Sequence, residues 1–307
     1  MAKKNINEMS FLDHLEDLRW HLIKSAAAIT LAATGAFLAK GFIFDVLIFG
    51  PSKASFITYQ LLCKASQYIG MESFCFTELP FRIQSRTMSG QFSAHIWTAI
   101  TAGFIIAFPY VVYQLWKFIS PGLHKDERKH SRGFIIISSF LFFLGVLFGY
   151  YVICPLSINF LGTYQVSNEV HNDFDLSSYI GLIRSSVLAS GLVFELPIII
   201  YFLTKVGLVT PAFLIKYRKY ALVVVLIISA IITPPDIASQ VIVAIPILIL
   251  YQVSILISRI VIRNQKRKEK KHVRLRSPSE KTKGHQKRNS LPMHHTCRGN
   301  GPGGNRL

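Results

Sequence analysis

The sequence has few charged residues and few cysteines for its length, and both shortages exclude broad classes of protein. Charged residues make up 16% of the 307 residues and hydrophobic ones 51%, a balance too apolar for an ordinary soluble domain. The four cysteines (Cys63, Cys75, Cys154 and Cys297) lack the close spacing of zinc or dithiol redox motifs. Cys63 and Cys75 share one polar stretch, where they form either a disulfide or two free thiols.

Motifs of common catalytic sites are also missing. We find no nucleotide-phosphate loop, no HExxH or GxSG motif and no pair of aspartates within an apolar run. We therefore expect that the protein is not an enzyme and holds no cofactor and no metal. The first 20 residues contain no apolar run, so we expect no secretory signal, and they contain too many acidic residues for a transit peptide.

Basic residues are concentrated at the C-terminal end. The net charge is +18, and the segment from Arg259 onward holds 15 Lys or Arg and two Glu. These basic runs lack the interleaved aromatic side chains on which nucleic-acid bases stack, so they favour anionic lipid or solvent over nucleic acid. We expect residues 1–262 to form a membrane domain and residues 263–307 a disordered, basic cytoplasmic tail.

Apolar stretches dominate the rest of the chain. A membrane-spanning helix needs ~20 apolar residues, and six stretches approach this length: about residues 22–46, 92–119, 133–161, 179–206, 220–233 and 238–259. As a helix the fifth stretch rises only ~21 Å, so we expect a thinned bilayer there or an extension by snorkelling lysines. The predicted fold is all-α, a polytopic membrane protein with six transmembrane helices.

Lys and Arg in the connections predict the orientation of these spans. They gather near the N-terminus, at about residues 117–132, at about 205–219 and in the tail, whereas residues 167–178 contain none. Because basic connections stay on the cytoplasmic side, six spans with both termini in the cytoplasm satisfy this pattern.

Acidic residues are scarce in this apolar chain, and the first group of them lies near the N-terminus. In residues 10–20, Ser10 and Asp13 resemble a capping box, and Leu12, Leu15 and Leu18 recur at helical spacing. This pattern predicts an amphipathic helix that leads into the first span. Its polar side presents Glu16 and Asp17, either as solvated acids or as a site for a cationic ligand.

Two connections also carry acids. Asp126 and Glu127 stand among five basic residues after the second span, where they either form ordinary salt bridges or bind a ligand. Asp236 immediately precedes the last apolar stretch, a position typical of a helix cap.

Glu195 lies deep within the fourth apolar stretch. A charged residue at such depth costs at least ~2.5–3.5 kcal/mol on insertion scales, so it usually has a functional role. Arg184 precedes it by 11 residues, which is ~16 Å along a helix axis, so we do not expect the two to pair directly.

Four stretches together resemble motifs of the TatC family, the signal-peptide-recognising subunit of the twin-arginine protein translocase. They are MSFLDHLEDLRWHL (9–22), YQLWKFISPGLHKDER (113–128), GLVFELP (191–197) and TPPDIASQ (233–240). They occur in the family's order among the expected spans, and the resemblance covers about residues 9–259. It implies a concave bundle in the bacterial plasma membrane.

The resemblance also implies a binding site for the paired arginines of a signal peptide. The family's loop glutamate and N-terminal acid match Glu127 and Asp17, although the family usually has Glu at the second position. Because Glu16 is adjacent, which of the two N-terminal acids contacts an arginine stays open. Carboxylates accept two parallel hydrogen bonds from a guanidinium, which lysine cannot supply. The implied signal-peptide site comprises Asp17, Glu16, Arg19, Phe118, Pro121, Glu127 and Arg128.

Further positions match the family's contacts with other proteins and its outer face. Glu195 matches a buried glutamate that engages a polar residue of a TatA- or TatB-type single-span partner. Pro51, Asp236 and Gln240 match outer-face positions. The implied partners are TatA- and TatB-type proteins, twin-arginine signal peptides of folded cargo, other copies of the subunit and the lipid bilayer. The proton gradient would supply the energy.

A proton-coupled secondary transporter that uses Glu195 is the alternative. Such transporters often contain inverted repeats and paired broken helices near the midplane. The sequence has one buried acid and no evident repeat, so it favours the translocase subunit.

Overall fold

Long helices form almost all of the described structure. The computed structural model describes residues 11–69, 81–119, 131–167, 169, 172–234 and 236–288. In chain order the elements, with η for a π-helix, are α1 (Phe11–Leu38), η2 (Phe42–Ile48), α2 (Ile57–Ile69), β1 (Arg82–Gln84), α3 (Gly90–Ile119), α5 (Ser131–Phe148), η4 (Gly149–Ile153), α6 (Cys154–Thr163), β2 (Asp173–Asp175), α7 (Leu176–Phe194), α8 (Leu196–Lys205), α9 (Pro211–Lys216), α10 (Arg218–Ile232) and α11 (Ile237–Arg288). The expected all-α membrane fold is confirmed.

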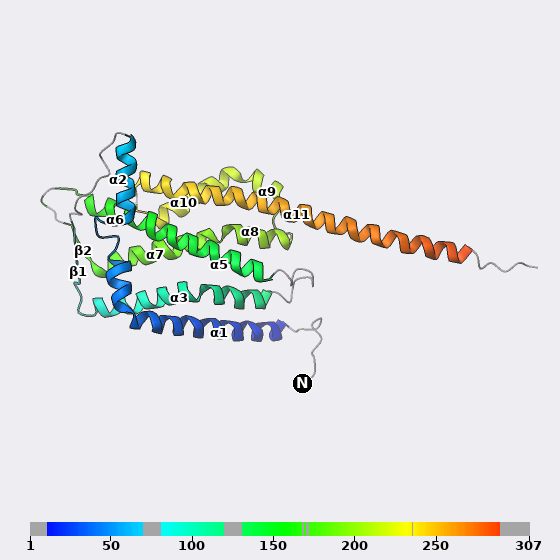
Figure 1. Cartoon of the computed structure of the whole chain (residues 1–307), viewed down its shortest axis with the longest axis horizontal. Coiled ribbons are helices and arrows are strands. Elements are labelled where there is room, and N and C mark those ends of the chain that lie inside the picture. Colours follow the sequence, from blue (N-terminus) through cyan, green and yellow to red (C-terminus); the bar gives the residue numbers. More distant parts are fainter. Residues whose placement is uncertain are drawn as a thin grey trace, which may run out of the picture. The chain divides into compact units, whose positions relative to one another are not determined.

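The chain divides into two compact units, and residues 1–258 form the first of them. Within this unit α1, α3, α5 and α7 run side by side (Figure 1). We call the end where α1 begins the N-terminal end of the bundle. The opposite end, where β1 pairs with β2, is called the ladder end.

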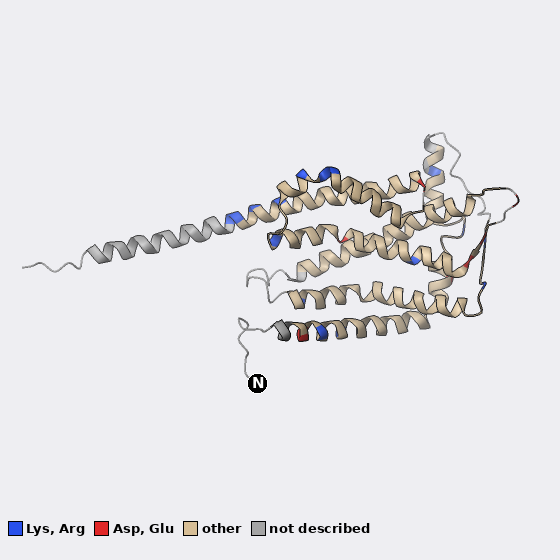
Figure 2. Cartoon of the chain, turned by 180° about the vertical axis from the view of Figure 1, so that it is seen from behind, with Lys and Arg blue, Asp and Glu red and all other residues tan. Residues whose placement is uncertain are grey.

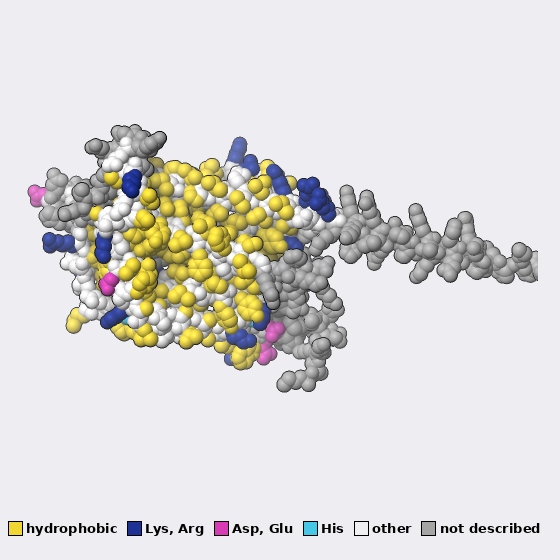
Figure 3. All heavy atoms as spheres, in the orientation of Figure 1, with side chains coloured by type: hydrophobic (Ala, Val, Ile, Leu, Met, Phe, Trp, Pro, Cys, Tyr) yellow, Lys and Arg dark blue, Asp and Glu magenta, His cyan; other side chains and the backbone are white. Residues whose placement is uncertain are grey.

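Five helical segments of the described chain are long and apolar enough to cross a membrane. They are Leu15–Leu38, Gly90–Ile119, Gly133–Thr163, Leu176–Lys205 and Ser239–Arg267. They correspond to five of the six spans predicted from the sequence. Figure 3 shows hydrophobic side chains over much of the face between the two ends of the bundle, as expected for a surface that contacts lipid.

The predicted span at residues 220–233 is shorter. α10 has 15 residues and rises ~22 Å, less than the ~30 Å of a bilayer's hydrocarbon core. It runs antiparallel to α11, since Ser229 Oγ donates to the Gln240 carbonyl (2.8 Å) and Arg218 donates to Gln252 Oε1 (2.7 Å). A sixth crossing, with both termini in the cytoplasm, therefore stays a prediction.

The N-terminal segment differs from the prediction. Instead of an amphipathic helix over residues 10–20 and a separate span over 22–46, one helix, α1, continues to Leu38. No Gly or Pro interrupts the first three turns, so the helix has no reason to break there. After a turn at Ala39 the chain enters η2, which ends the span earlier than the hydropathy indicates.

The third and fourth spans each consist of shorter helices joined end to end. α5, η4 and α6 form the third, and α7 and α8 form the fourth. Pro155 lies in the first turn of α6 and Pro197 in the first turn of α8. Proline has no N–H to donate and clashes with the preceding turn, which explains a new segment at each position. Glu195 is the residue between α7 and α8.

Small residues bring these two spans together. Ser190 Oγ of α7 donates to the Gly145 carbonyl of α5 (2.7 Å). A Cβ atom added to Gly145 would lie 2.7 Å from the Ser190 carbonyl oxygen, so only glycine permits this approach. The contact agrees with the close helix packing that small residues allow in membranes.

The ladder end is closed by two short parallel strands. Arg82 pairs with Asp173 and Gln84 with Asp175. Asp175 Oδ1 accepts the backbone N–H of Arg86 (3.2 Å), and its Oδ2 accepts the N–H of Ser177 (3.0 Å). The hydrogen bond from Arg86 is the main cause of a lowered pKa of the Asp175 carboxyl.

The cysteines next to this end separate into two classes. Cys63 of α2 is disulfide-bonded, whereas Cys154 is a buried free thiol. Cys75 and Cys297 lie outside the described residues.

α11 continues beyond the last predicted span. We expect a disordered tail from residue 263, whereas α11 ends at Arg288. Lys, Arg, Glu and Gln have high helix propensity, which is consistent with a helix that continues into a basic sequence. Residues 289–307 lie outside the described chain.

Candidate functional site

The pairing of α1 with α3 determines which residues meet at the N-terminal end. His21 Nδ1 of α1 lies 2.8 Å from Gln114 Oε1 of α3. Near the ladder end, His95 Nε2 of α3 lies 3.0 Å from the Phe37 carbonyl oxygen of α1, and the two rings stack with centroids 3.9 Å apart. As the residue number increases on α1 it decreases on α3, so the helices are antiparallel and in fixed register.

Close packing midway along the pair maintains this register. Gly103 of α3 contacts the backbone of Ala33, and an added Cβ would lie 2.6 Å from the Ala33 nitrogen. No real side chain occupies so short a distance, so glycine allows the two helix backbones to meet.

Because of this register between α1 and α3, Asp17 lies near the C-terminal end of α3. It lies one turn before His21, and Phe118 lies one turn after Gln114. The His21 and Phe118 rings meet edge to face with centroids 6.5 Å apart. Asp17 therefore lies at about the level of Phe118, where α3 ends and the next connection begins.

The predicted signal-peptide residues divide into two groups. Glu16, Asp17 and Arg19 are exposed on α1, and Phe118 is half-buried on α3. The structure brings these four to the same end of the bundle. The remaining three, Pro121, Glu127 and Arg128, lie outside the described residues.

The sequence analysis missed Gln114 as a member of this region. Its side chain is only 3% exposed, and a buried amide without a hydrogen-bond partner is costly. His21 supplies that partner from the neighbouring helix. A lone glutamine within an apolar stretch was the available signal.

Glu195 forms the second candidate site, about two thirds of the way along the fourth span (Leu176–Lys205). It is 8% exposed, and Ser138 Oγ of α5 donates to its Oε2 (2.7 Å). Its Oε1 has no hydrogen-bond partner within the described chain. As predicted, Arg184 does not pair with it, because its guanidinium carbon lies 5.3 Å from the centre of the Trp97 ring.

An apolar groove runs along the bundle towards the ladder end. It has a volume of about 620 Å³ and is formed by α1, η2, α3, α5, η4 and α7, with small residues such as Ala32 and Gly35 on α1. Arg184 and Thr98 are among its few polar members. The groove offers an apolar surface of the kind that accepts another helix.

The three predicted outer-face residues have structural contacts. Asp236 Oδ2 accepts the N–H of Ser239 (2.9 Å) and so caps α11 as predicted. Gln240 Nε2 donates to the Leu226 carbonyl (3.2 Å), joining α11 to α10. The Pro51 carbonyl accepts the Tyr59 hydroxyl (3.1 Å). These residues do not lie with Asp17.

Charged residues are distributed mainly at the two ends of the bundle (Figure 2). Among the described residues, no group of three or more His, Cys, Asp or Glu side chains is arranged to hold a metal ion. The exposed acids at the N-terminal end can attract a cationic ligand, and the apolar groove along the bundle can accept another helix.

Comparisons with known proteins agree with the motifs. The family model described as "Sec-independent protein translocase protein (TatC)" matches residues 13–246. TatC of Blattabacterium sp. subsp. Periplaneta americana is 48% identical over 258 residues, which are 83% of this chain and 97% of that protein. TatCy of Bacillus subtilis is 34% identical, over 84% of this chain and 92% of that protein.

Solved structures of this kind are also similar. A crystal structure of a twin-arginine translocase receptor, TatC, matches with a TM-score of 0.60 and 30% identity, over 81% of this chain and 99% of that one. A second crystal structure, of the receptor in DDM, matches with a TM-score of 0.62 and 31% identity, over 80% of this chain and 99% of that one.

Proposed function

The chain belongs to the TatC family of Sec-independent protein translocase proteins, and we propose that it binds the twin-arginine signal peptides of folded precursor proteins. It is a multi-pass protein of the bacterial plasma membrane. One observation carries the proposal for the site: the register of α1 against α3 places Asp17 at the level of Phe118. The segment that contains Glu127 follows Phe118 closely in the sequence.

The proposed site consists of two carboxylates at the cytoplasmic surface. Asp17, or Glu16 beside it, supplies one from α1, and Glu127 supplies the other from the connection after α3. Each carboxylate accepts a bidentate pair of hydrogen bonds from one arginine. Lysine carries the same charge but lacks the planar fork, so the site discriminates between the two. Arg19, Phe118, Pro121 and Arg128 support this arrangement in the proposal.

The apolar segment that follows the arginines in a signal peptide then enters the bundle. The groove along α1, α3 and α7 supports this step, because its wall is almost wholly apolar and small residues allow close approach.

Glu195 is proposed to contact a TatA- or TatB-type single-span protein. Its Oε2 is held by Ser138, whereas its Oε1 has no partner among the described residues. A buried acceptor without a donor favours a polar side chain from a neighbouring helix. In this proposal the protein scaffolds the export complex, together with other copies of itself. It catalyses no covalent chemistry, needs no cofactor and draws on the proton gradient.

Binding of a twin-arginine peptide to the purified protein in detergent tests the receptor role. A twin-lysine peptide is the ligand control, Asp17→Ala and Glu127→Ala are the test variants, and Glu169→Ala, exposed at the ladder end, is the matched control variant. We expect arginine-selective binding that both test variants weaken and Glu169→Ala retains. Equal binding of both peptides, unchanged in the test variants, would refute the site and favour the proton-coupled transporter.

A further inference from the structure

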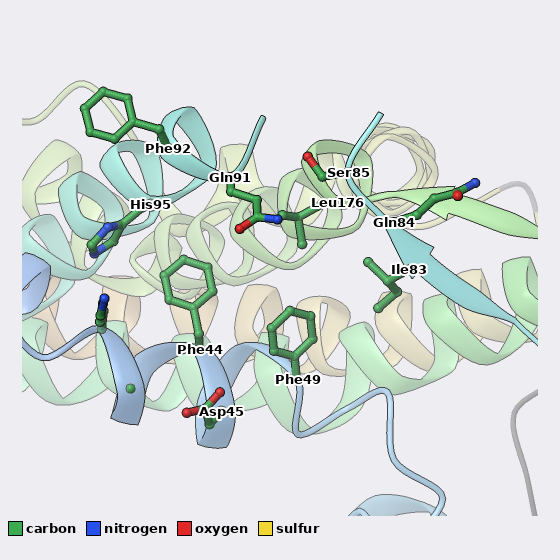
Figure 4. Close-up of a pocket in the computed structure, with 12 residues that line it drawn as sticks. Phe44, Asp45, Phe49, Ile83, Gln84, Ser85, Gln91, Phe92, His95 and Leu176 are labelled. Carbon is green, nitrogen blue, oxygen red and sulfur yellow. The ribbon is translucent and has the colours of Figure 1, made fainter. Parts of the chain in front are cut away.

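A second cavity lies at the ladder end, apart from the proposed signal-peptide site. Its volume is about 560 Å³, within the usual range of small-ligand pockets. Figure 4 shows Phe44 of η2, and Phe49 directly after η2, extending towards the side of the cavity that His95, Gln91 and Ile83 occupy.

The cavity lies next to the point where one membrane-spanning helical segment ends and two others begin. The membrane-spanning part of α1 ends at Leu38, and the spans of α3 and α7 begin at Gly90 and Leu176. Residues within a few positions of these three ends line the cavity, including Lys40 and Gln91. Where spanning helices end, the hydrocarbon core gives way to the polar headgroup region.

The lining provides one charge of each sign. Lys40 and Asp45 both line the cavity and both are exposed. Within the part of the chain that the structure describes, neither side chain has a hydrogen-bond or ion-pair partner. Ser85, Gln84 and Gln91 add neutral polar groups to the lining. A ligand that complements the cavity therefore carries both an anionic and a cationic group.

An exposed apolar stripe continues from the cavity into the span of α3. Phe92, itself part of the lining, is followed at four-residue intervals by Ile96 and Ile100. They are 64%, 36% and 41% exposed, so they form one lipid-facing ridge on the helix. A ligand with a polar head in the cavity therefore finds an apolar surface for its chains directly below.

We propose that this cavity binds the headgroup of a phospholipid with a primary ammonium group, the phosphatidylethanolamine class. Lys40 contacts the phosphate, Asp45 accepts hydrogen bonds from the ammonium, and the acyl chains lie along the ridge of Phe92, Ile96 and Ile100. The proposed orientation of the chain assigns this lipid to the outer leaflet; the chemistry of the cavity does not depend on that assignment.

Native mass spectrometry of the full chain in detergent tests this proposal. The protein is exposed to phosphatidylethanolamine, phosphatidylglycerol and phosphatidylcholine with identical acyl chains. We expect preferential retention of phosphatidylethanolamine, because the glycerol headgroup has no cation and the choline headgroup has no N–H to donate. Water-soluble glycerophosphoethanolamine is added as a competitor and should not displace the lipid.

Two variants separate the roles of the charges. Asp45→Asn should abolish the preference for phosphatidylethanolamine over phosphatidylglycerol. Lys40→Gln should instead weaken the binding of each of these two lipids by about fivefold, which is the change in affinity expected for the loss of one exposed ion pair. Lys53→Gln and Glu169→Gln, which change exposed charges elsewhere, serve as matched controls and should bind these lipids as the wild type does.

Hydrogen exchange of the wild-type protein tests the site without any variant. Phosphatidylethanolamine should protect the backbone amides of residues 40–45 and 91–95 more than phosphatidylglycerol does.

The outcomes are decisive. No headgroup preference in the wild type, or equal losses in the control and cavity variants, would overturn the lipid site. Displacement by glycerophosphoethanolamine would replace the lipid with a soluble phosphorylated amine. Twin-arginine peptide binding, measured on the same preparations, should be unchanged in Lys40→Gln and Asp45→Asn, so failure here is distinct from failure of the receptor proposal.

Discussion

Replacing Gly103 by alanine should force α1 away from α3. The added Cβ would lie 2.6 Å from the Ala33 nitrogen, whereas ordinary contacts begin at 3.4 Å, so the helices must separate by most of an ångström. Overpacking of this kind costs about 1–3 kcal/mol. Alanine also stabilises a helix by up to ~1 kcal/mol relative to glycine. This gain must be subtracted before the steric cost can be determined from the measured stability.

Gly181→Ala on α7 supplies that correction. An added Cβ there meets nothing within 4 Å, so it gains helix propensity without a clash. In paired melting experiments in detergent, Gly103→Ala should be less stable than Gly181→Ala by about 1–3 kcal/mol, which is roughly 2–10 °C for a chain of this size. Gly103→Ala should also bind the twin-arginine peptide more weakly, because Asp17 moves with α1. Equal stability of the two variants, with unchanged binding, would refute the argument that the α1–α3 contact positions the site.

Three further changes test individual contacts. Ser138→Ala removes the hydrogen-bond donor of the buried glutamate and should cost about 1–3 kcal/mol in melting experiments, whereas Ser139→Ala, whose hydroxyl has no partner in the described structure, should cost less. Gln114→Leu leaves His21 without its acceptor and should weaken twin-arginine peptide binding more than it lowers the melting temperature; the reverse order would contradict a positioning role. Asp175 has a folded-state pKa below its ordinary value, so its stabilisation is present above the unfolded-state pKa of ~4 and lost as the pH falls through the folded-state value. Asp175→Asn should therefore flatten the loss of stability in acid, and an unchanged acid profile would argue against this contribution.

Hydropathy predicted the long spans because it reports where apolar residues continue for ~20 positions. Hydropathy did not predict the points where a helix ends or changes its type while the sequence stays apolar. α1 (Phe11–Leu38) continues without interruption because no helix breaker intervenes. The chain then enters η2, whose sequence is as apolar as the helix before it. The breaks before Pro155 and Pro197 did have a signal, since proline cannot continue the hydrogen-bond ladder.

Contacts between segments that lie far apart in the chain could not be predicted from the sequence. The His21–Gln114 hydrogen bond joins residues 93 positions apart, and neither residue indicates its partner. The β1–β2 ladder joins strands of three residues each, which are too short for a period-two pattern. By contrast, two predictions followed from local sequence: Glu195 does not pair with Arg184, and Asp236 caps α11. The structure agrees with both.

A double-mutant cycle between the protein and the signal peptide tests the central claim most directly. Binding is measured for Asp17→Asn, Glu16→Gln and Glu127→Gln, each against peptides in which one or the other arginine is replaced by glutamine. We predict that Glu127 couples to one arginine, and Asp17 or Glu16 to the other, by about 1.5–3 kcal/mol, as expected for charge-assisted hydrogen bonds. Additive effects within ~0.5 kcal/mol for all three acids would contradict the account and place the arginines elsewhere.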